Sequence, residues 1–131
     1  MENKRTKILV VDDESEVLDT LKHFLSVKGY EVMGAYSGKE ALRILENKKV
    51  DLILLDIMMP GMRGTTIAKI IKDRYPDIKI MVVTAYPEEG RKVSQDIVLE
   101  GLFIKPLGTQ ELYNRLLNIT KDSYASNHQP L

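Results

Sequence analysis

The chain has 131 residues, of which 44% are hydrophobic and 29% charged, and this balance is typical of one globular domain rather than a disordered segment. Lysine plus arginine and aspartate plus glutamate number 19 each, so there is no net positive charge to attract nucleic acid or an anionic membrane. Cysteine is absent, which excludes disulfides, thiolate metal sites and cysteine nucleophiles.

The apolar pattern alternates along the chain between strand-like runs and helix-like spacing. The run KILVV at 7–11 predicts a strand, and an apolar stripe over 14–28 predicts the helix that follows it. A second, more exposed strand is predicted over 30–35. Ser37, with Glu40 three residues later, is a capping-box signature for the start of the next helix.

The same alternation continues through the middle of the chain. The aliphatic run at 50–55 predicts a third strand that is buried on both faces. The spacing of isoleucines at 67, 70 and 71 predicts a helix that ends before Pro76. The run IKIMVVTA at 78–85 then predicts a fourth strand.

The last third of the chain has a weaker pattern. The stretch 87–98 predicts only a short or irregular helix, because Gly90 interrupts it and its apolar residues cluster at its end. A short fifth strand at 101–104 and a final helix follow. We predict one domain over 1–120 and a polar, disordered tail over 121–131.

Strands that alternate with helices pair in parallel through right-handed crossovers, and the helices then cover both faces of the sheet. We therefore predict an α/β fold with a flavodoxin-like, doubly wound, five-stranded parallel sheet in the order 2-1-3-4-5. Apolar runs are too short for a transmembrane helix or a signal peptide core, so we expect a cytoplasmic protein with no membrane partner.

Charged or hydroxylated residues stand directly after four of the predicted strands. Asp12 and Asp13 follow the first strand, Asp56 the third, Thr84 the fourth and Lys105 the fifth. The predicted strand order brings them to one edge of the sheet, where doubly wound folds bind ligands. Three close carboxylates repel one another and favour a bound cation, and a site with only oxygen ligands favours Mg²⁺.

Such a site suits phosphoryl chemistry, because Mg²⁺ keeps part of its water shell and shares phosphate oxygens. Asp56 can attack as a carboxylate nucleophile and become an aspartyl phosphate. Lys105 can hold one phosphoryl oxygen by its charge, and Thr84 can donate a hydrogen bond to another. Asp12 and Asp13 could instead simply cap the following helix, but that interpretation does not explain why all five residues converge.

Four segments, ILVVDDE, LILLDIMMPGM, VVTAY and FIKP, occur in this order, and through them the chain resembles the receiver domain of two-component response regulators. The resemblance covers residues 6–119. It implies that Asp56 is the phosphoacceptor, Thr84 the switch hydroxyl and Lys105 the lysine that contacts the phosphate. The implied Mg²⁺ site uses Asp13, Asp56 and the Met58 carbonyl directly, and Asp12 through a water molecule.

The resemblance also implies partners. The phosphoryl group would come from a phosphohistidine on a sensor histidine kinase or a histidine phosphotransfer protein. The switched domain would regulate a downstream effector protein or output domain, and a phosphorylation-dependent homodimer is a further expectation. No direct nucleic acid binding is implied for this domain. It would not be an enzyme acting on other substrates, since it would catalyse only its own phosphorylation and dephosphorylation.

The chain departs from the family pattern at Leu102, because many receivers have tyrosine or phenylalanine three residues before the lysine. Phe103 stands beside it and should point to the opposite face of the sheet, since strand side chains alternate. This departure leaves the phosphorylation site intact and concerns the surface that reports phosphorylation.

Three alternative functions fit the sequence less well. A flavodoxin-like binder of flavin phosphate would need a loop rich in Gly, Ser and Thr after the first strand, whereas DDES at 12–15 would repel an anion. A haloacid-dehalogenase-type phosphatase would carry Asp-x-Asp there, which this chain lacks. A degenerate receiver that only docks other proteins is disfavoured by the complete set of acidic, hydroxyl and lysine residues.

Overall fold

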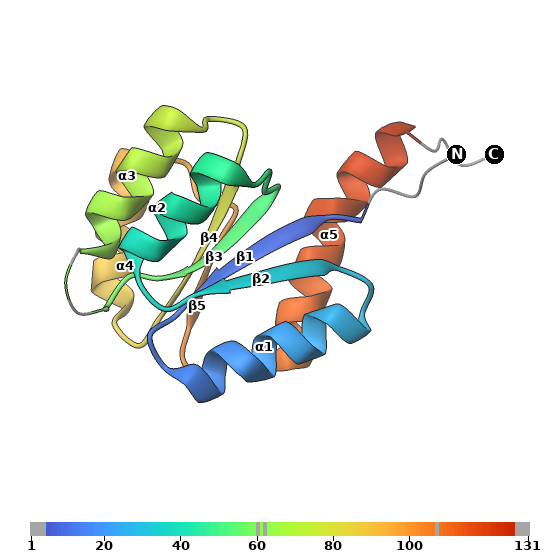
Figure 1. Cartoon of the computed structure of the whole chain (residues 1–131), viewed down its shortest axis with the longest axis horizontal. Helices are drawn as coiled ribbons and strands as arrows, with labels where there is room; N and C mark the ends of the chain where they lie inside the picture. The colour runs from blue at the N-terminus through green and yellow to red at the C-terminus, as the bar shows by residue number, and fades with distance from the viewer. Residues whose placement is uncertain (1–4, 60, 62, 107, 128–131) are drawn as a thin grey trace.

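The structure is a computed structural model that describes residues 5–59, 61, 63–106 and 108–127, the last seven of these by their backbone alone. In this part of the chain, strands and helices alternate strictly (Figure 1). The elements are β1 (Lys7–Val11), α1 (Ser15–Val27), β2 (Glu31–Ala35), α2 (Gly38–Asn47), β3 (Leu52–Asp56), α3 (Gly64–Arg74), β4 (Lys79–Thr84), α4 (Pro87–Asp96), β5 (Gly101–Ile104) and α5 (Thr109–Asn127).

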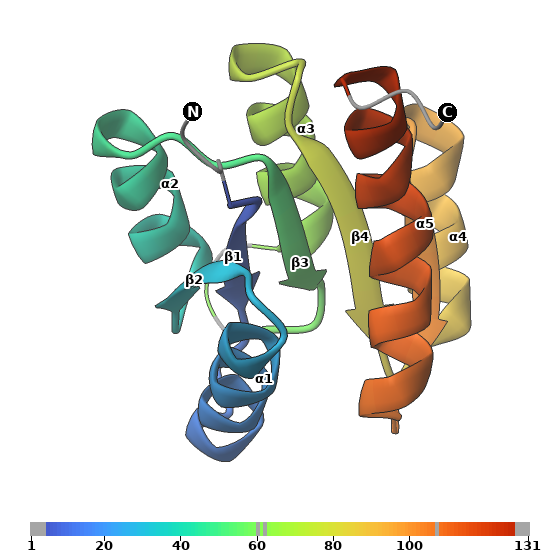
Figure 2. The same ribbon diagram turned by 90° about the vertical axis from the view of Figure 1, so that its right-hand side faces the viewer.

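The five strands form one parallel sheet in the order β2-β1-β3-β4-β5, which confirms the predicted flavodoxin-like fold. Helices α2, α3 and α4 cover one face, and α1 and α5 cover the other (Figures 1 and 2). Each face has its own hydrophobic core, because successive strand residues point to opposite sides of the sheet. All five residues of β3 are buried between the two layers.

The capping box predicted at the start of α2 is confirmed. The Ser37 hydroxyl accepts the N–H of Glu40 at 3.1 Å, and the Glu40 carboxylate accepts the N–H of Tyr36 at 3.1 Å. The first bond satisfies a backbone donor that the first turn of a helix leaves without a partner, and the second fixes the residue before the N-cap.

The helix predicted over 87–98 is short, as expected, but it is not irregular. Helix α4 is a regular ten-residue helix with Pro87 in its first turn, where a missing N–H costs nothing. Gly90 is buried, and a Cβ atom there would overlap Leu102 Cδ1 and lie 3.1 Å from Leu102 Cδ2. The glycine therefore allows α4 to pack closely on β5. Leu102 packs on the α4 side and Phe103 belongs to the opposite core, as predicted.

Helix α5 differs from the prediction at its end. Its backbone remains helical to Asn127, where the sequence predicts a disordered tail from residue 121. Once a helix has formed, each further residue adds a backbone hydrogen bond at little extra cost. Residues 1–4 of the predicted domain and 128–131 of the predicted tail lie outside the described residues. The predicted domain boundary at residue 120 stays a prediction. Among the described helices, none combines the length and the apolar character needed to cross a bilayer.

The connection between β3 and α3 depends on a close backbone approach at Gly64. Its N–H donates to the Ile57 carbonyl at 3.2 Å, and a Cβ atom there would overlap the backbone of Ile57. We expect Gly64→Ala to lower the free energy of unfolding by roughly 2 kcal/mol or more, because backbone atoms must shift. Denaturant titration measures this change.

Gly108→Ala is the matched control for this substitution. A Cβ atom on Gly108 meets no heavy atom within 4 Å, so its effect should stay within about 1 kcal/mol in either direction. Equal losses in the two variants would contradict the steric argument.

Candidate functional site

The order of the strands sets which side chains meet at the carboxyl edge of the sheet. Strand β1 lies between β2 and β3, with Val11 opposite Leu55 in the parallel register. The next residue of each strand is therefore an aspartate at the same edge, Asp12 beside Asp56. Thr84 ends β4, and Lys105 directly follows β5.

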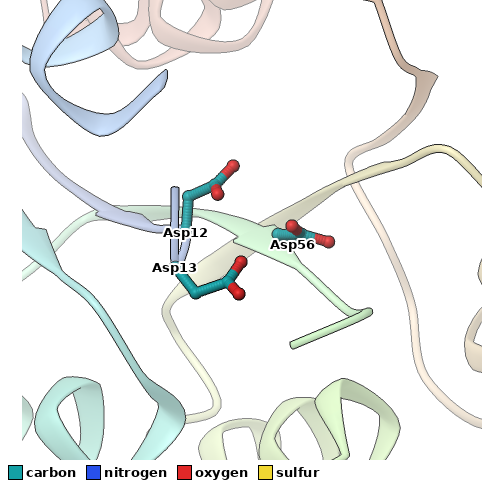
Figure 3. Close-up of side chains that lie close together, drawn as sticks. All are labelled: Asp12, Asp13 and Asp56. Atoms are coloured by element: carbon teal, nitrogen blue, oxygen red, sulfur yellow. The ribbon is translucent and has the colours of Figure 1, made fainter. Parts of the chain in front are cut away.

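Three carboxylates meet at this edge. Asp12, Asp13 and Asp56 each offer one oxygen, and these oxygens all lie within 4.8 Å of one another. Figure 3 shows the three side chains projecting from the ends of β1 and β3 into one region. Asp12 and Asp56 are buried, only 3% and 5% exposed, whereas Asp13 is exposed. The cluster fits a hard divalent cation such as Mg²⁺, which prefers carboxylate oxygens and retains some of its water.

Lys105 neutralises part of this negative charge. Its Nζ lies 3.0 Å from Asp12 Oδ2 and 3.0 Å from Asp56 Oδ2. Burial alone would lower the pKa of Lys105, but hydrogen bonds and charges from the two aspartates outweigh it and raise that pKa above 10.5. The lysine is therefore a permanent cation at neutral pH. The peptide bond that joins Lys105 to Pro106 is cis.

Backbone donors fix the second oxygen of each buried carboxylate. Asp12 Oδ1 accepts the N–H of Glu14 at 2.9 Å, and Asp56 Oδ1 accepts the N–H of Met58 at 3.0 Å. Each side chain thus bonds the backbone through one oxygen and Lys105 through the other. This pairing orients the carboxylates and offsets the cost of burying them.

Thr84 is fully buried at the end of β4. Its hydroxyl accepts the N–H of Tyr86 at 2.9 Å, and its carbonyl accepts the N–H of Lys105 at 2.8 Å. The hydroxyl therefore serves the loop before α4 rather than the carboxylates in this structure. The structure thus brings Asp12, Asp13, Asp56 and Lys105 together and leaves Thr84 bonded beside them.

Two residues near the site were missed by the sequence interpretation. Glu14 Oε1 lies 3.9 Å from Lys105 Nζ, and Tyr86 supplies the donor to Thr84. Glu14 had a signal, since it directly follows the acidic pair. No sequence signal identified Tyr86, because it acts through its backbone N–H, a group that every residue except proline carries.

The amino-acid sequence is similar to those of known proteins. Residues 8–117 match the family model of the response regulator receiver domain. The response regulator SaeR of Staphylococcus aureus is 33% identical over 127 residues, which are 96% of this chain and 55% of SaeR. The chain thus spans about half the length of the curated relatives it matches.

Solved structures agree with this match. A CheY-like receiver domain protein of Methanospirillum hungatei JF-1 is 29% identical with a TM-score of 0.87, covering 94% of this chain and 99% of that one. The response regulator TrrA of Thermotoga maritima, solved in complex with Mg(2+)-BeF, is 34% identical with a TM-score of 0.77, covering 86% and 97%. The chain belongs to the response regulator receiver domain family, whose members typically act as phosphoacceptors in two-component signalling.

Proposed function

We propose that this domain takes a phosphoryl group onto Asp56 from a phosphohistidine on a sensor histidine kinase or histidine phosphotransfer protein. The observation that carries the proposal is the position of the Asp56 carboxylate. It is buried at the end of β3, 3.0 Å from Lys105 Nζ and within the cluster formed with Asp12 and Asp13. A nucleophile beside both a fixed cation and a cation-binding carboxylate pair suits transfer of a dianionic group.

The proposed metal is Mg²⁺, held by the carboxylates of Asp13 and Asp56 and the Met58 carbonyl, with Asp12 acting through water. When bound, the ion would neutralise charge on the transferred group. The protein's own groups have separate tasks. The Met58 N–H, 3.0 Å from Asp56 Oδ1, holds that oxygen, so that Oδ2 is the atom available to attack phosphorus. Lys105 would pass from Asp56 Oδ2 to a phosphoryl oxygen as the new bond forms.

The domain would be a signalling phosphoacceptor in the cytoplasm, not an enzyme with separate substrates. It would catalyse only its own phosphorylation and dephosphorylation. The Thr84 hydroxyl would donate to a phosphoryl oxygen and so report the modification. The output would be a separate effector protein or an output domain. SaeR is longer than this chain, and this supports an output domain as one form of the output.

Labelling experiments test the assignment of Asp56 as the acceptor. A small donor such as acetyl phosphate should add one phosphoryl group to the wild-type protein in the presence of Mg²⁺, and chelation should abolish the reaction. Asp56→Asn removes the nucleophilic carboxylate and should remove this label, as measured by intact-protein mass spectrometry. Asp51→Asn, at an exposed aspartate before β3, is the control and should label normally. Full labelling of Asp56→Asn would refute the assignment.

Metal titration tests the role of Asp13. Asp13→Ala should weaken Mg²⁺ binding at least tenfold, since it removes one of three clustered carboxylates. Helix α1 has no side-chain cap hydrogen bond, so the substitution should not cost the helix a cap. Relief of repulsion should leave the metal-free protein equally or slightly more stable. Calorimetric titration measures the affinity, and Asp19→Ala on the exposed side of α1 is the control. Unchanged affinity in Asp13→Ala would remove Asp13 from the site.

Stability measurements test the role of Lys105. Lys105→Met should lower the free energy of unfolding by roughly 2 kcal/mol or more without Mg²⁺, because two buried carboxylates lose their cation. The pKa of Lys105 is raised, so its stabilising effect is complete at neutral pH and disappears as pH rises through that raised pKa. The difference from wild type should therefore persist through neutral pH and shrink in strongly alkaline solution. Lys39→Met, at an exposed lysine of α2, is the control in denaturant titrations, and equal stability of the two variants would contradict the argument.

A further inference from the structure

A cleft of about 630 Å³ opens beside the carboxylate cluster, between α1 and the segment that follows β5. Asp56 and Lys105 line it, so it is continuous with the site described above. Most of its remaining wall is apolar. Val10, Leu54 and Val83 come from three strands of the sheet, and Val17 and Leu21 come from α1. Figure 2 shows α1 and α5 on this face of the sheet.

The apolar wall has no part in the mechanism proposed for Asp56. A phosphoryl group is bound by charges and hydrogen-bond donors, and these come from the carboxyl edge of the sheet. The strand residues of the wall are recessed, since Val10, Leu54 and Val83 are 1%, 2% and 6% exposed. A volume of this size and an apolar wall with a few charged groups are typical of small-molecule sites. The recessed wall favours a narrow organic group over the surface of a protein.

Charge restricts which organic group can enter. Glu14 and Glu16, the first acidic residues around the start of α1, also line the cleft. Together with Asp12 and Asp56 they face a single ammonium group, that of Lys105. An anionic group in this space would meet uncompensated carboxylates, whereas an uncharged apolar group would gain by leaving water.

We propose that this cleft is a subsite for the acyl group of small acyl phosphates, and that it selects uncharged, apolar acyl groups. The inference rests on the proposed function of Asp56 and names a class of small phosphoryl donor for that residue. The phosphoryl group lies at Asp56 and Lys105, while the acyl chain occupies the space between Val17, Leu21 and the sheet.

The transfer balances without any further reactant. An Asp56 carboxylate oxygen forms a bond to phosphorus as the bond from phosphorus to the acyl oxygen breaks. The acyl carboxylate leaves with the electron pair of that bond. One carboxylate is consumed and one released, so no proton is taken up or lost. Because the leaving group is itself a carboxylate, no acid needs to protonate it.

The test compares donors on the intact domain with Mg²⁺ present, each rate being corrected for the donor's hydrolysis without protein. Phosphoramidate, which has no acyl group, gives the baseline. Butyryl phosphate should label Asp56 with a second-order rate constant roughly tenfold above that of acetyl phosphate. Transfer of each methylene group from water into the cleft should raise the rate constant by up to about fourfold. Succinyl phosphate, with a chain of similar length that ends in a carboxylate, should fall below butyryl phosphate.

These donors separate the two proposals. Failure of every donor, phosphoramidate included, to label Asp56 would overturn the proposed function itself. Labelling by phosphoramidate with equal rates for acetyl, butyryl and succinyl phosphate would overturn the subsite alone.

Substitutions then locate the subsite. Val17→Trp should fill the cleft and bring the ratio of butyryl to acetyl rates close to one. Val27→Trp, the same change at a 69% exposed position of the same helix, should keep the wild-type ratio. Thr20→Phe, at an exposed position that lines the cleft, is a second variant for the case in which Val17→Trp does not give the wild-type circular dichroism spectrum. A wild-type ratio in a folded cleft variant would show that the acyl group binds elsewhere and overturn the inference.

Discussion

The ion pairs of Lys105 with Asp12 and Asp56 join parts of the sheet that no backbone hydrogen bond connects. Strand β5 lies at one edge of the sheet and β1 lies beyond β3 and β4, yet Lys105 Nζ is 3.0 Å from both Asp12 and Asp56. Buried carboxylates are costly unless they are paired and hydrogen-bonded. Here both conditions are met, because the other oxygen of each accepts a backbone N–H. The position of Asp56 therefore depends on the loop after β5 as much as on its own strand.

Lys105 neutralises only part of the negative charge at the site, and the remaining charge affects the chemistry of the site. One ammonium group faces three clustered carboxylates and a fourth, Glu14, at 3.9 Å. The remaining negative charge attracts a cation to a place where the protein offers only oxygen ligands. In the proposed function, a phosphoryl group on Asp56 would add further negative charge and compete with Asp12 for Lys105. The same lysine would then stabilise the unmodified site and respond to its modification.

Much of the fold and the site could be predicted because both follow from local patterns. Alternating strands and helices define a parallel sheet, and its strand order brings Asp12 next to Asp56. What the sequence did not reveal at Gly90 and at the acidic pair depends on the surrounding structure. In the sequence Gly90 resembles a helix breaker, but in the structure its lack of a side chain lets α4 approach Leu102. The sequence does not show that Asp12 is buried and Asp13 exposed, because this difference depends on where the chain turns after β1.

The packing around Gly90 also bears on how a modification at Asp56 would be felt elsewhere. Tyr86 is the N-cap residue of α4, and its N–H is bonded to the Thr84 hydroxyl at 2.9 Å. A Thr84 hydroxyl drawn toward a phosphoryl group would pull on the N-cap residue of this helix. Because α4 packs closely on Leu102 at Gly90, a movement of the helix would be passed to β5 through this contact. Leu102 replaces the aromatic residue that many receivers have at this position, so in the proposed function the start of α4 would carry the displacement.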